Sequence, residues 1–155
     1  MTSNPDYDSG TYPPFAVTAD TAVFTRIDGR LCVLMIERGS EPYLGRWALP
    51  GGFVDIDEDL PVAAVRELAE ETGIDAVDLR QLGAYGAPDR DPRMRVVSVV
   101  FWTFLDDLGD PDGGDDAADA FLVPIDEVLA DPSRLAFDHH QVLMDAVARV
   151  EAELA

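Results

Sequence analysis

The stretch Gly52–Ile74, GFVDIDEDLPVAAVRELAEETGI, decides how the rest of this 155-residue chain is interpreted. The stretch predicts a helix, because Asp59 is a favourable N-cap, Pro61 fits the first turn, and Gly73 fits the position just past the end. An apolar stripe at helical spacing supports the same conclusion. Its residues are Val62, Val65, Leu68 and Ala69.

Three carboxylates are expected on one face of this helix. Glu67, Glu70 and Glu71 are spaced at i, i+3 and i+4, which makes them neighbours on a helix surface. Three like charges packed together are costly unless a cation balances them. Mg²⁺ takes oxygen ligands and is usually held by one or two carboxylates plus substrate phosphates. Arg66 is placed to orient a neighbouring carboxylate such as Glu58 through a forked hydrogen bond.

The same residues resemble the Nudix box at every specified position. The spacing is Gly52, five residues, Glu58, seven residues, then Arg66-Glu67-Leu68-x-Glu70-Glu71-x-Gly73-Ile74. A solvated acidic helix face would explain a lone Glu-x-x-Glu-Glu, but it does not explain the whole pattern. The resemblance implies a hydrolase of nucleoside diphosphates linked to another moiety, with Mg²⁺ or Mn²⁺ as its cofactor.

The resemblance also implies roles for single residues. Metal ligation would come from the carbonyl of Gly51 and from three carboxylates, those of Glu67, Glu70 and Glu71, with Glu70 alternatively acting as a base. Arg66 and Glu58 would complete the catalytic set as a supporting pair. The metal would neutralise the pyrophosphate, polarise its phosphorus and generate a nucleophilic hydroxide.

Composition limits the partners and the location of the protein. The formal net charge of −20 and the absence of lysine argue against nucleic acid or an anionic membrane as a partner. No stretch is apolar enough to cross a bilayer, and the N-terminus lacks a basic segment followed by an apolar one. We therefore expect a soluble, cytoplasmic protein whose partner is a small nucleotide.

The order of expected elements indicates an α/β protein. Strands are predicted at 16–27, 31–37, 77–85, 94–105 and 118–123, with a hairpin turn at Asp28-Gly29 and helices at 124–129 and 137–154. Together with the resemblance, this order implies a Nudix-like α/β/α sandwich with a mixed β-sheet. One domain would span residues 15–155, after a flexible N-terminal arm at residues 1–14. Relatives are commonly homodimers, and the chain is compatible with that state.

Two groups of residues are candidates for substrate binding. Arg38 and Arg46 lie in the loop before the box and could hold phosphates, although exposed loop arginines usually do no more than solvate. Residues 85–105, YGAPDRDPRMRVVSVVFWTFL, resemble a segment of Nudix proteins that act on ADP-ribose. On that resemblance the diphosphate or the terminal ribose would contact Arg90, Asp91 and Arg93. A local salt-bridged turn explains these three residues nearly as well.

Two further sites are suggested with less detail. In the acidic loop at 106–116, Asp115 or Asp116 resembles the downstream base or additional metal ligand of relatives, although an acidic run is usually solvated surface. His139 and His140 open the last helix and diverge by roughly 100° on it. We expect both to be surface or capping residues, with one of them able to approach the rim of the site.

The sequence thus predicts an ADP-ribose pyrophosphatase that produces AMP and ribose 5-phosphate. Other Nudix activities are open, because the box also serves hydrolysis of NADH, dinucleoside polyphosphates and oxidised nucleoside triphosphates. A non-enzymatic nucleotide-sensing domain, as in nicotinamide-linked transcriptional regulators, is the second alternative. It is disfavoured by the intact carboxylates, by the net charge, and by the end of the chain at Ala155, which leaves no room for a DNA-binding domain.

Overall fold

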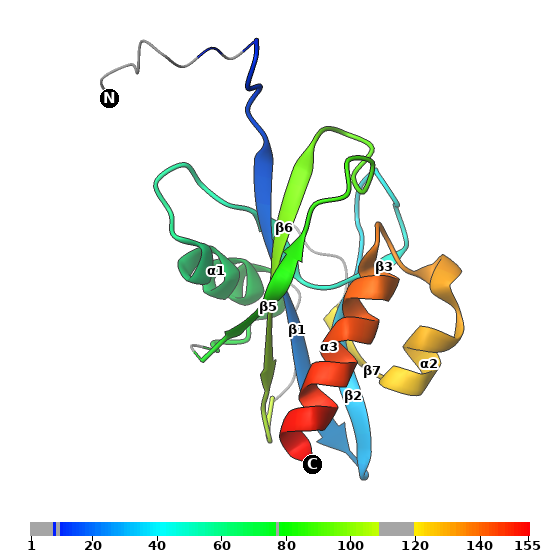
Figure 1. The fold of residues 1–155 in the computed structure, drawn as a ribbon. Coiled ribbons are helices and arrows are strands. Elements are labelled where there is room, and N and C mark those ends of the chain that lie inside the picture. The colour runs from blue at the N-terminus through cyan, green and yellow to red at the C-terminus, as the bar shows by residue number, and fades with distance from the viewer. Residues whose placement is uncertain (1–7, 9, 77, 109–119) are drawn as a thin grey trace.

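A mixed β-sheet lies between helices in the computed structural model, which describes residues 8, 10–76, 78–108 and 120–155 (Figure 1). The strands are β1 (Ala16–Ile27), β2 (Arg30–Glu37), β3 (Trp47–Ala48), β4 (Gly51–Phe53), β5 (Arg80–Tyr85), β6 (Val96–Phe104) and β7 (Ala120–Pro124). The helices are α1 (Leu60–Thr72), α2 (Ile125–Ala130) and α3 (His139–Leu154), with a short 3-10 turn at Pro132–Arg134. The predicted α/β class is confirmed.

The sheet is mixed because one central pair of strands is parallel. Its order is β3-β2-β1-β6-β5, and β4 and β7 pair with β1 and β2 respectively. β1 and β6 run parallel, whereas the other pairs are antiparallel. The strand predicted at 94–105 is β6, and it lies between β1 and β5. The predicted hairpin turn joins β1 to β2, with positive φ at both Asp28 and Gly29.

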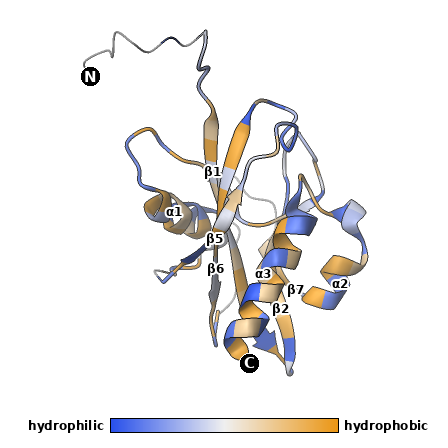
Figure 2. Ribbon diagram, viewed as in Figure 1, coloured by the Kyte–Doolittle hydropathy of each residue, from blue (hydrophilic) through white to orange (hydrophobic). Residues whose placement is uncertain are grey.

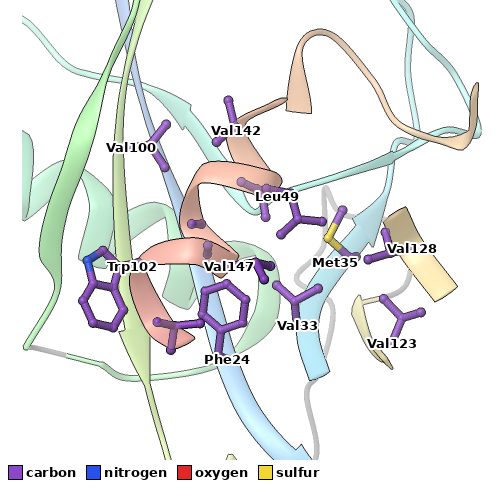
Figure 3. Close-up of a cluster of buried hydrophobic side chains, with 14 of the residues drawn as sticks. Phe24, Val33, Met35, Leu49, Val100, Trp102, Val123, Val128, Val142 and Val147 are labelled. Atoms are coloured by element: carbon purple, nitrogen blue, oxygen red, sulfur yellow. The ribbon is translucent and has the colours of Figure 1, made fainter. Parts of the chain in front are cut away.

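Alternate residues of the central strands face opposite layers, as expected for a strand covered on both faces. On one side, Ala19 of β1 packs with Ala63 and Ala64 of α1. On the other side, Phe24 of β1 belongs to the main core, where it packs with Val142 and Val147 of α3 (Figure 3). α1 and α3 therefore cover opposite faces of one sheet, which confirms the predicted sandwich (Figure 1).

Helix α1 begins and ends where its local signals predict. Asp59 accepts a hydrogen bond from the Leu60 N–H at 2.8 Å, and Gly73 adopts a left-handed φ of 74° while its N–H bonds to the Ala69 carbonyl. The predicted apolar stripe is wrong at Val62, which is 58% exposed. The buried residues are Ala63, Ala64, Leu68 and Thr72. The buried face of the helix is therefore centred on small residues, and Val62 lies outside it.

Helix α3 is amphipathic, with hydrophobic and hydrophilic residues alternating along its ribbon (Figure 2). Its apolar face is buried, at Val142, Leu143, Ala146, Val147 and Val150. The helix begins at His139, two residues later than expected, because Phe137 has a positive φ of 53° and cannot be its first helical residue.

Parts of the expected organisation lie outside the described residues. Residues 1–7 and 9 belong to the predicted arm, and residues 109–119 include both Asp115 and Asp116. The arm and the role of these two aspartates therefore stay predictions. Across the part of the chain that the structure describes, every helix is too short or too polar to cross a membrane.

Candidate active site

Two glutamates of α1 face the glycines of β4. The Oε2 atom of Glu71 accepts a hydrogen bond from the Gly51 N–H at 3.0 Å. The Glu67 side chain is 14% exposed and lies so close to Gly52 that a Cβ atom there would be 2.5 Å from its carboxyl group. Glycine at position 52 leaves room for the Glu67 carboxyl group, whereas glycine at position 51 leaves room for Asp20 and Ala19 of β1.

Arg66 joins the carboxylates of the box into one network. Its Nε and Nη2 atoms donate to the two oxygens of Glu58 at 2.6 and 2.8 Å, which is the predicted forked hydrogen bond. Its Nη1 atom donates to Glu67 at 2.8 Å and to Glu70 at 3.2 Å. Glu70 is 59% exposed, so Arg66 holds it at the outer edge of the network.

Burial disfavours the charged form of the Glu67 and Glu71 carboxyl groups in the metal-free protein. Desolvation raises the pKa of Glu71 to about 8, against a hydrogen bond from Gly51 that lowers it, and the charges of Glu67 and Asp20 raise it further. Desolvation also raises the pKa of Glu67. The hydrogen bond from Arg66, by contrast, lowers the pKa of Glu58. A cation bound between Glu67 and Glu71 would offset the desolvation of both.

The donors present fit a divalent cation whose coordination the substrate completes. Among the described residues, no group of three or more His, Cys, Asp or Glu side chains is arranged to hold a metal. Glu67 and Glu71 are the pair that would hold it, beside the backbone of Gly51. Two carboxylates plus substrate phosphates is the usual arrangement for Mg²⁺. Glu70, the third predicted ligand, shares the Nη1 atom of Arg66 with Glu67, and its role as a metal ligand stays a prediction.

A cleft of about 230 Å³ opens beside β4. Its lining comes from β1, β2, β4, the loop before β6 and the segment that leads into α3, and it includes Asp20, Arg38, Gly52, Arg93, Phe137 and His139. Segments that are more than a hundred residues apart in the sequence therefore meet around one cavity next to the carboxylates. The cleft is large enough for part of a nucleotide.

Two of the predicted substrate-binding arginines line this cleft around a shared aromatic ring. The guanidinium of Arg38 lies 4.9 Å from the ring centre of Phe137, and its Nε atom donates to the Pro42 carbonyl at 2.7 Å. Arg93 lies 5.8 Å from the same ring and 5.1 Å from that of Phe53. Desolvation and the nearby charge of Arg93 lower the pKa of Arg38. Two cations this close would favour an anionic ligand between them.

The other predicted substrate-binding residues are placed differently. Arg90 and Asp91 line the cleft, but the Arg90 side chain is only 4% exposed and donates two hydrogen bonds to Asp138, at 3.0 and 2.7 Å. Asp91 accepts from both the backbone and the side chain of Arg93, so the local salt-bridged turn is present. Arg46 lies outside the cleft and stacks over Tyr43.

Sequence reasoning missed Asp20, which lies in the floor of the cleft. Its carboxylate is 8% exposed and accepts hydrogen bonds from the hydroxyls of Thr18, at 3.2 Å, and Ser98. The available signal was an aspartate in the middle of a strand whose other central residues are apolar or threonine, since a buried carboxylate requires specific partners.

His139 and His140 were expected to be surface or capping residues, with one of them able to approach the rim of the site. The surface position is wrong for His139, which is buried, but this histidine does line the cleft. The ring is 4% exposed, and its Nδ1 atom accepts a hydrogen bond from the Leu49 N–H at 3.1 Å. His140 is half-buried, and its Nε2 atom lies 3.3 Å from the Leu129 carbonyl. The divergence of adjacent helical positions was correct, but tertiary packing turned His139 inward.

The family of the chain follows from a comparison with known proteins. The model of the NUDIX domain matches residues 15–146. The chain belongs to the Nudix family. The stretch that carries the box forms the β4 strand, the turn and α1 in this Nudix domain.

Two curated relatives carry names related to ADP-ribose. The chain is 36% identical over 146 residues to the ADPR responsive transcriptional repressor NtrR of Acinetobacter baylyi, covering 93% of this chain and 58% of that protein. It is 42% identical over 114 residues to the ADP-ribose pyrophosphatase of Methanocaldococcus jannaschii, covering 73% of this chain and 64% of that protein. The chain thus spans about three fifths of the length of these relatives.

A solved structure is similar over nearly the full length. It is the NUDIX domain of Shewanella oneidensis NrtR complexed with ADP ribose, with a TM-score of 0.83 and 34% sequence identity. The match covers 94% of each chain. The Nudix fold is therefore shared over the whole of the described domain.

Proposed function

We propose that this Nudix domain hydrolyses the pyrophosphate bond of ADP-ribose, with AMP and ribose 5-phosphate as products and Mg²⁺ or Mn²⁺ as cofactor. The observation that carries the proposal is the pair Glu67 and Glu71, desolvated against the glycines of β4 at the edge of a cleft that contains two arginines. The names of the relatives support ADP-ribose as the substrate.

The residues of helix α1 and of the adjacent cleft divide the chemistry among them. Glu67 and Glu71 would hold the cation, which when bound lowers the pKa of water and neutralises the phosphates. Arg38 and Arg93 would bind the diphosphate, and Arg66 orients Glu67 through a direct hydrogen bond. The oxygen of water forms the new bond to phosphorus, and the bridging oxygen leaves with the other phosphate.

The proton of the attacking water needs an acceptor. Glu70 is one candidate, and Asp115 or Asp116, which lie outside the described residues, are the others. Comparing Asp115→Asn with Asp116→Asn separates them, because the variant that removes the base slows turnover while retaining substrate affinity. Unchanged turnover in both variants would leave the role to Glu70.

The substrate assignment is tested by comparing kcat/KM for ADP-ribose, NADH, a dinucleoside polyphosphate and an oxidised nucleoside triphosphate, each with Mg²⁺ and with Mn²⁺. We expect a clear preference for ADP-ribose. Glu71→Gln should cut turnover by about 100-fold or more, since the change is nearly isosteric but removes an anionic ligand. Glu151→Gln on α3, at an exposed position outside the cleft, is the matched control. Preference for another substrate would replace ADP-ribose in the proposal.

A second function is sensing of ADP-ribose without hydrolysis. It is favoured by the match of 93% of this chain to a protein named as an ADPR responsive repressor. Calorimetric binding of ADP-ribose with no release of AMP, in the presence of either metal, would support sensing over catalysis. The intact pair Glu67 and Glu71 favours catalysis.

The net charge of −20 supports a small-molecule partner and not nucleic acid or an anionic membrane. A cytoplasmic location and a homodimer belong to the same proposal. Size-exclusion chromatography with light scattering tests the homodimer directly, since a monomer has a mass of 16.9 kDa.

A further inference from the structure

Asp20 offers a hydrogen-bond acceptor in the floor of the cleft. Its Oδ2 atom accepts from Thr18 and Ser98, whereas the Oδ1 atom faces Gly51, the residue paired with Asp20 across the two strands. Both Asp20 and Gly51 line the cleft. A carboxylate fixed in this way through its Oδ2 atom has its Oδ1 atom held beside Gly51 in the cleft lining, with little side-chain entropy left to lose on binding.

His139 offers a donor in the same cleft. The Leu49 N–H donates to the Nδ1 atom, so this nitrogen carries no proton and the neutral ring has its proton on Nε2. Burial lowers the pKa of His139, and this effect outweighs the carboxylates of Asp20 and Asp138, which raise it. The residue lines the cleft, and its neutral ring carries one N–H donor, at Nε2.

The ring is held in place from several sides. Asp138 directly precedes His139 in the sequence. Its ion pair with Arg90 links the loop before β6 to the start of α3. The Phe137 ring lies 5.5 Å from the imidazole. A buried histidine fixed by a backbone donor and an adjacent ion pair is suited to recognition, because its position is set before the ligand arrives.

We propose that Asp20 and His139 form an acceptor–donor pair that recognises the base of an adenine nucleotide. This inference rests on the proposed function and names residues that determine its specificity. Adenine presents an amino group beside a ring nitrogen that accepts, which is the complement of a carboxylate beside an N–H. The amino group donates to Asp20, and N1 or N7 accepts from His139.

The pair rejects a base with oxygen at the same position. Hypoxanthine differs from adenine by an oxo group in place of the amino group, so its oxygen would face the Asp20 carboxylate with no proton between them. A site built to receive a donor discriminates strongly against an analogue that lacks it, because its own buried polar group is left unpaired.

The test is equilibrium binding of AMP and IMP to the full chain, measured by titration calorimetry. Neither nucleotide has a pyrophosphate bond, so the result does not depend on hydrolysis. We expect AMP to bind about tenfold more tightly than IMP, in line with the value of one matched hydrogen bond. Asp20→Asn should reduce or invert this ratio, because an amide can donate to the oxo group.

His139→Asn is the second variant. The Asn side-chain oxygen can still accept from the Leu49 N–H, whereas the Nε2 donor is removed. AMP affinity should fall about fivefold, and it should then become insensitive to replacement of N1 or N7 by carbon in deaza analogues. A merely structural role would lower the affinities of AMP and its deaza analogues alike.

Several results would overturn the inference. They are equal binding of AMP and IMP by the wild-type protein, or an unchanged AMP-to-IMP ratio in Asp20→Asn. The deaza analogues test the role of His139 in the wild-type protein, so this test stands even where a substitution prevents folding. If the wild-type protein binds both deaza analogues as tightly as AMP, His139 has no role in recognition of the base. Hydrolysis of ADP-ribose without a base preference defeats this inference alone, and a base preference without hydrolysis defeats only the proposed activity.

Discussion

At the scale of single residues, the box is organised by one arginine and two glycines. Arg66 bonds to Glu58, Glu67 and Glu70 at once, which only a planar guanidinium with several donors can do. Gly52 leaves the space that the Glu67 carboxyl group occupies, and Gly51 leaves the space for Asp20 on β1. The identities of these residues are therefore constrained by geometry as much as by charge.

Gly52→Ala should displace Glu67, because the new Cβ atom would lie 2.5 Å from its carboxyl group. That carboxyl group is the end of a flexible side chain, so we expect the fold to persist and kcat/KM to fall by about tenfold or more. Steady-state kinetics and a thermal melt measure the two effects. Gly86→Ala is the control, because its Cβ would meet only Val97 at 3.7 Å. Full activity in Gly52→Ala would argue against a metal-binding role for Glu67.

Arg66→Lys preserves the positive charge but loses the fork. A single ammonium group cannot hold both oxygens of Glu58 while it also contacts Glu67, so Glu67 loses its orientation. We expect the Mg²⁺ concentration for half-maximal activity to rise by about 10-fold. A metal titration of activity measures it, and an unchanged titration curve would show that Arg66 does not act through the metal ligands.

At the scale of elements, helix α1 is well specified at its ends and less well in its orientation. Asp59 and Gly73 act locally, so their roles could be predicted from the sequence. The buried face could not, because the apolar stripe suggested Val62 whereas the small residues Ala63 and Ala64 pack against β1. Close approach to the sheet requires small side chains, and hydrophobicity alone does not report that.

Gly73→Ala should destabilise the protein by about 1 kcal/mol, because a φ of 74° is unfavourable for a residue with a Cβ atom. The free energy of unfolding from urea denaturation measures the change. Gly83→Ala in β5 is the matched control, since its φ is ordinary and an added Cβ meets no atom within 4 Å. Equal effects of the two substitutions would contradict a special role for the left-handed conformation.

At the scale of the whole molecule, the site depends on segments from both faces of the sheet that come together at the end of β4. The carboxylates come from α1 on one face, and His139 comes from the start of α3 on the other. β1 crosses between them and supplies Asp20, whereas Arg38 follows β2. No single segment contains the cleft, so its composition depends on the sheet order.

The contribution of Glu71 to the stability of the metal-free protein should fall as the pH rises from 4.5 to about 8. In this interval the folded protein keeps a proton on Glu71, whose pKa is raised to about 8, whereas the unfolded chain has released it at its usual value of 4.5. The folded state thus binds more protons, and its advantage is complete below pH 4.5 and lost as the pH approaches 8. Melting temperatures in the presence of a chelator measure this trend.

Glu71→Gln provides the control for the pH trend, because the amide does not titrate. Its melting temperature should vary less with pH over the same interval. Mg²⁺ added at pH 8 should raise the melting temperature of the wild-type protein more than that of the variant, since the cation replaces the proton between Glu67 and Glu71. Parallel pH curves for the two proteins would show that the buried carboxyl group does not control stability there.

The sequence by itself determined the fold class, the course of α1 and the network around Arg66, because these depend on spacing along one continuous segment. The α/β/α sandwich was predictable too, since apolar periodicity and the box pattern agreed. Only the tertiary structure decided which arginines reach the cleft: Arg38 and Arg93 line it, Arg90 is held by Asp138, and Arg46 faces elsewhere. Asp20 and His139 likewise became part of the site only through packing, because their partners, Ser98 and Leu49, are 78 and 90 residues away.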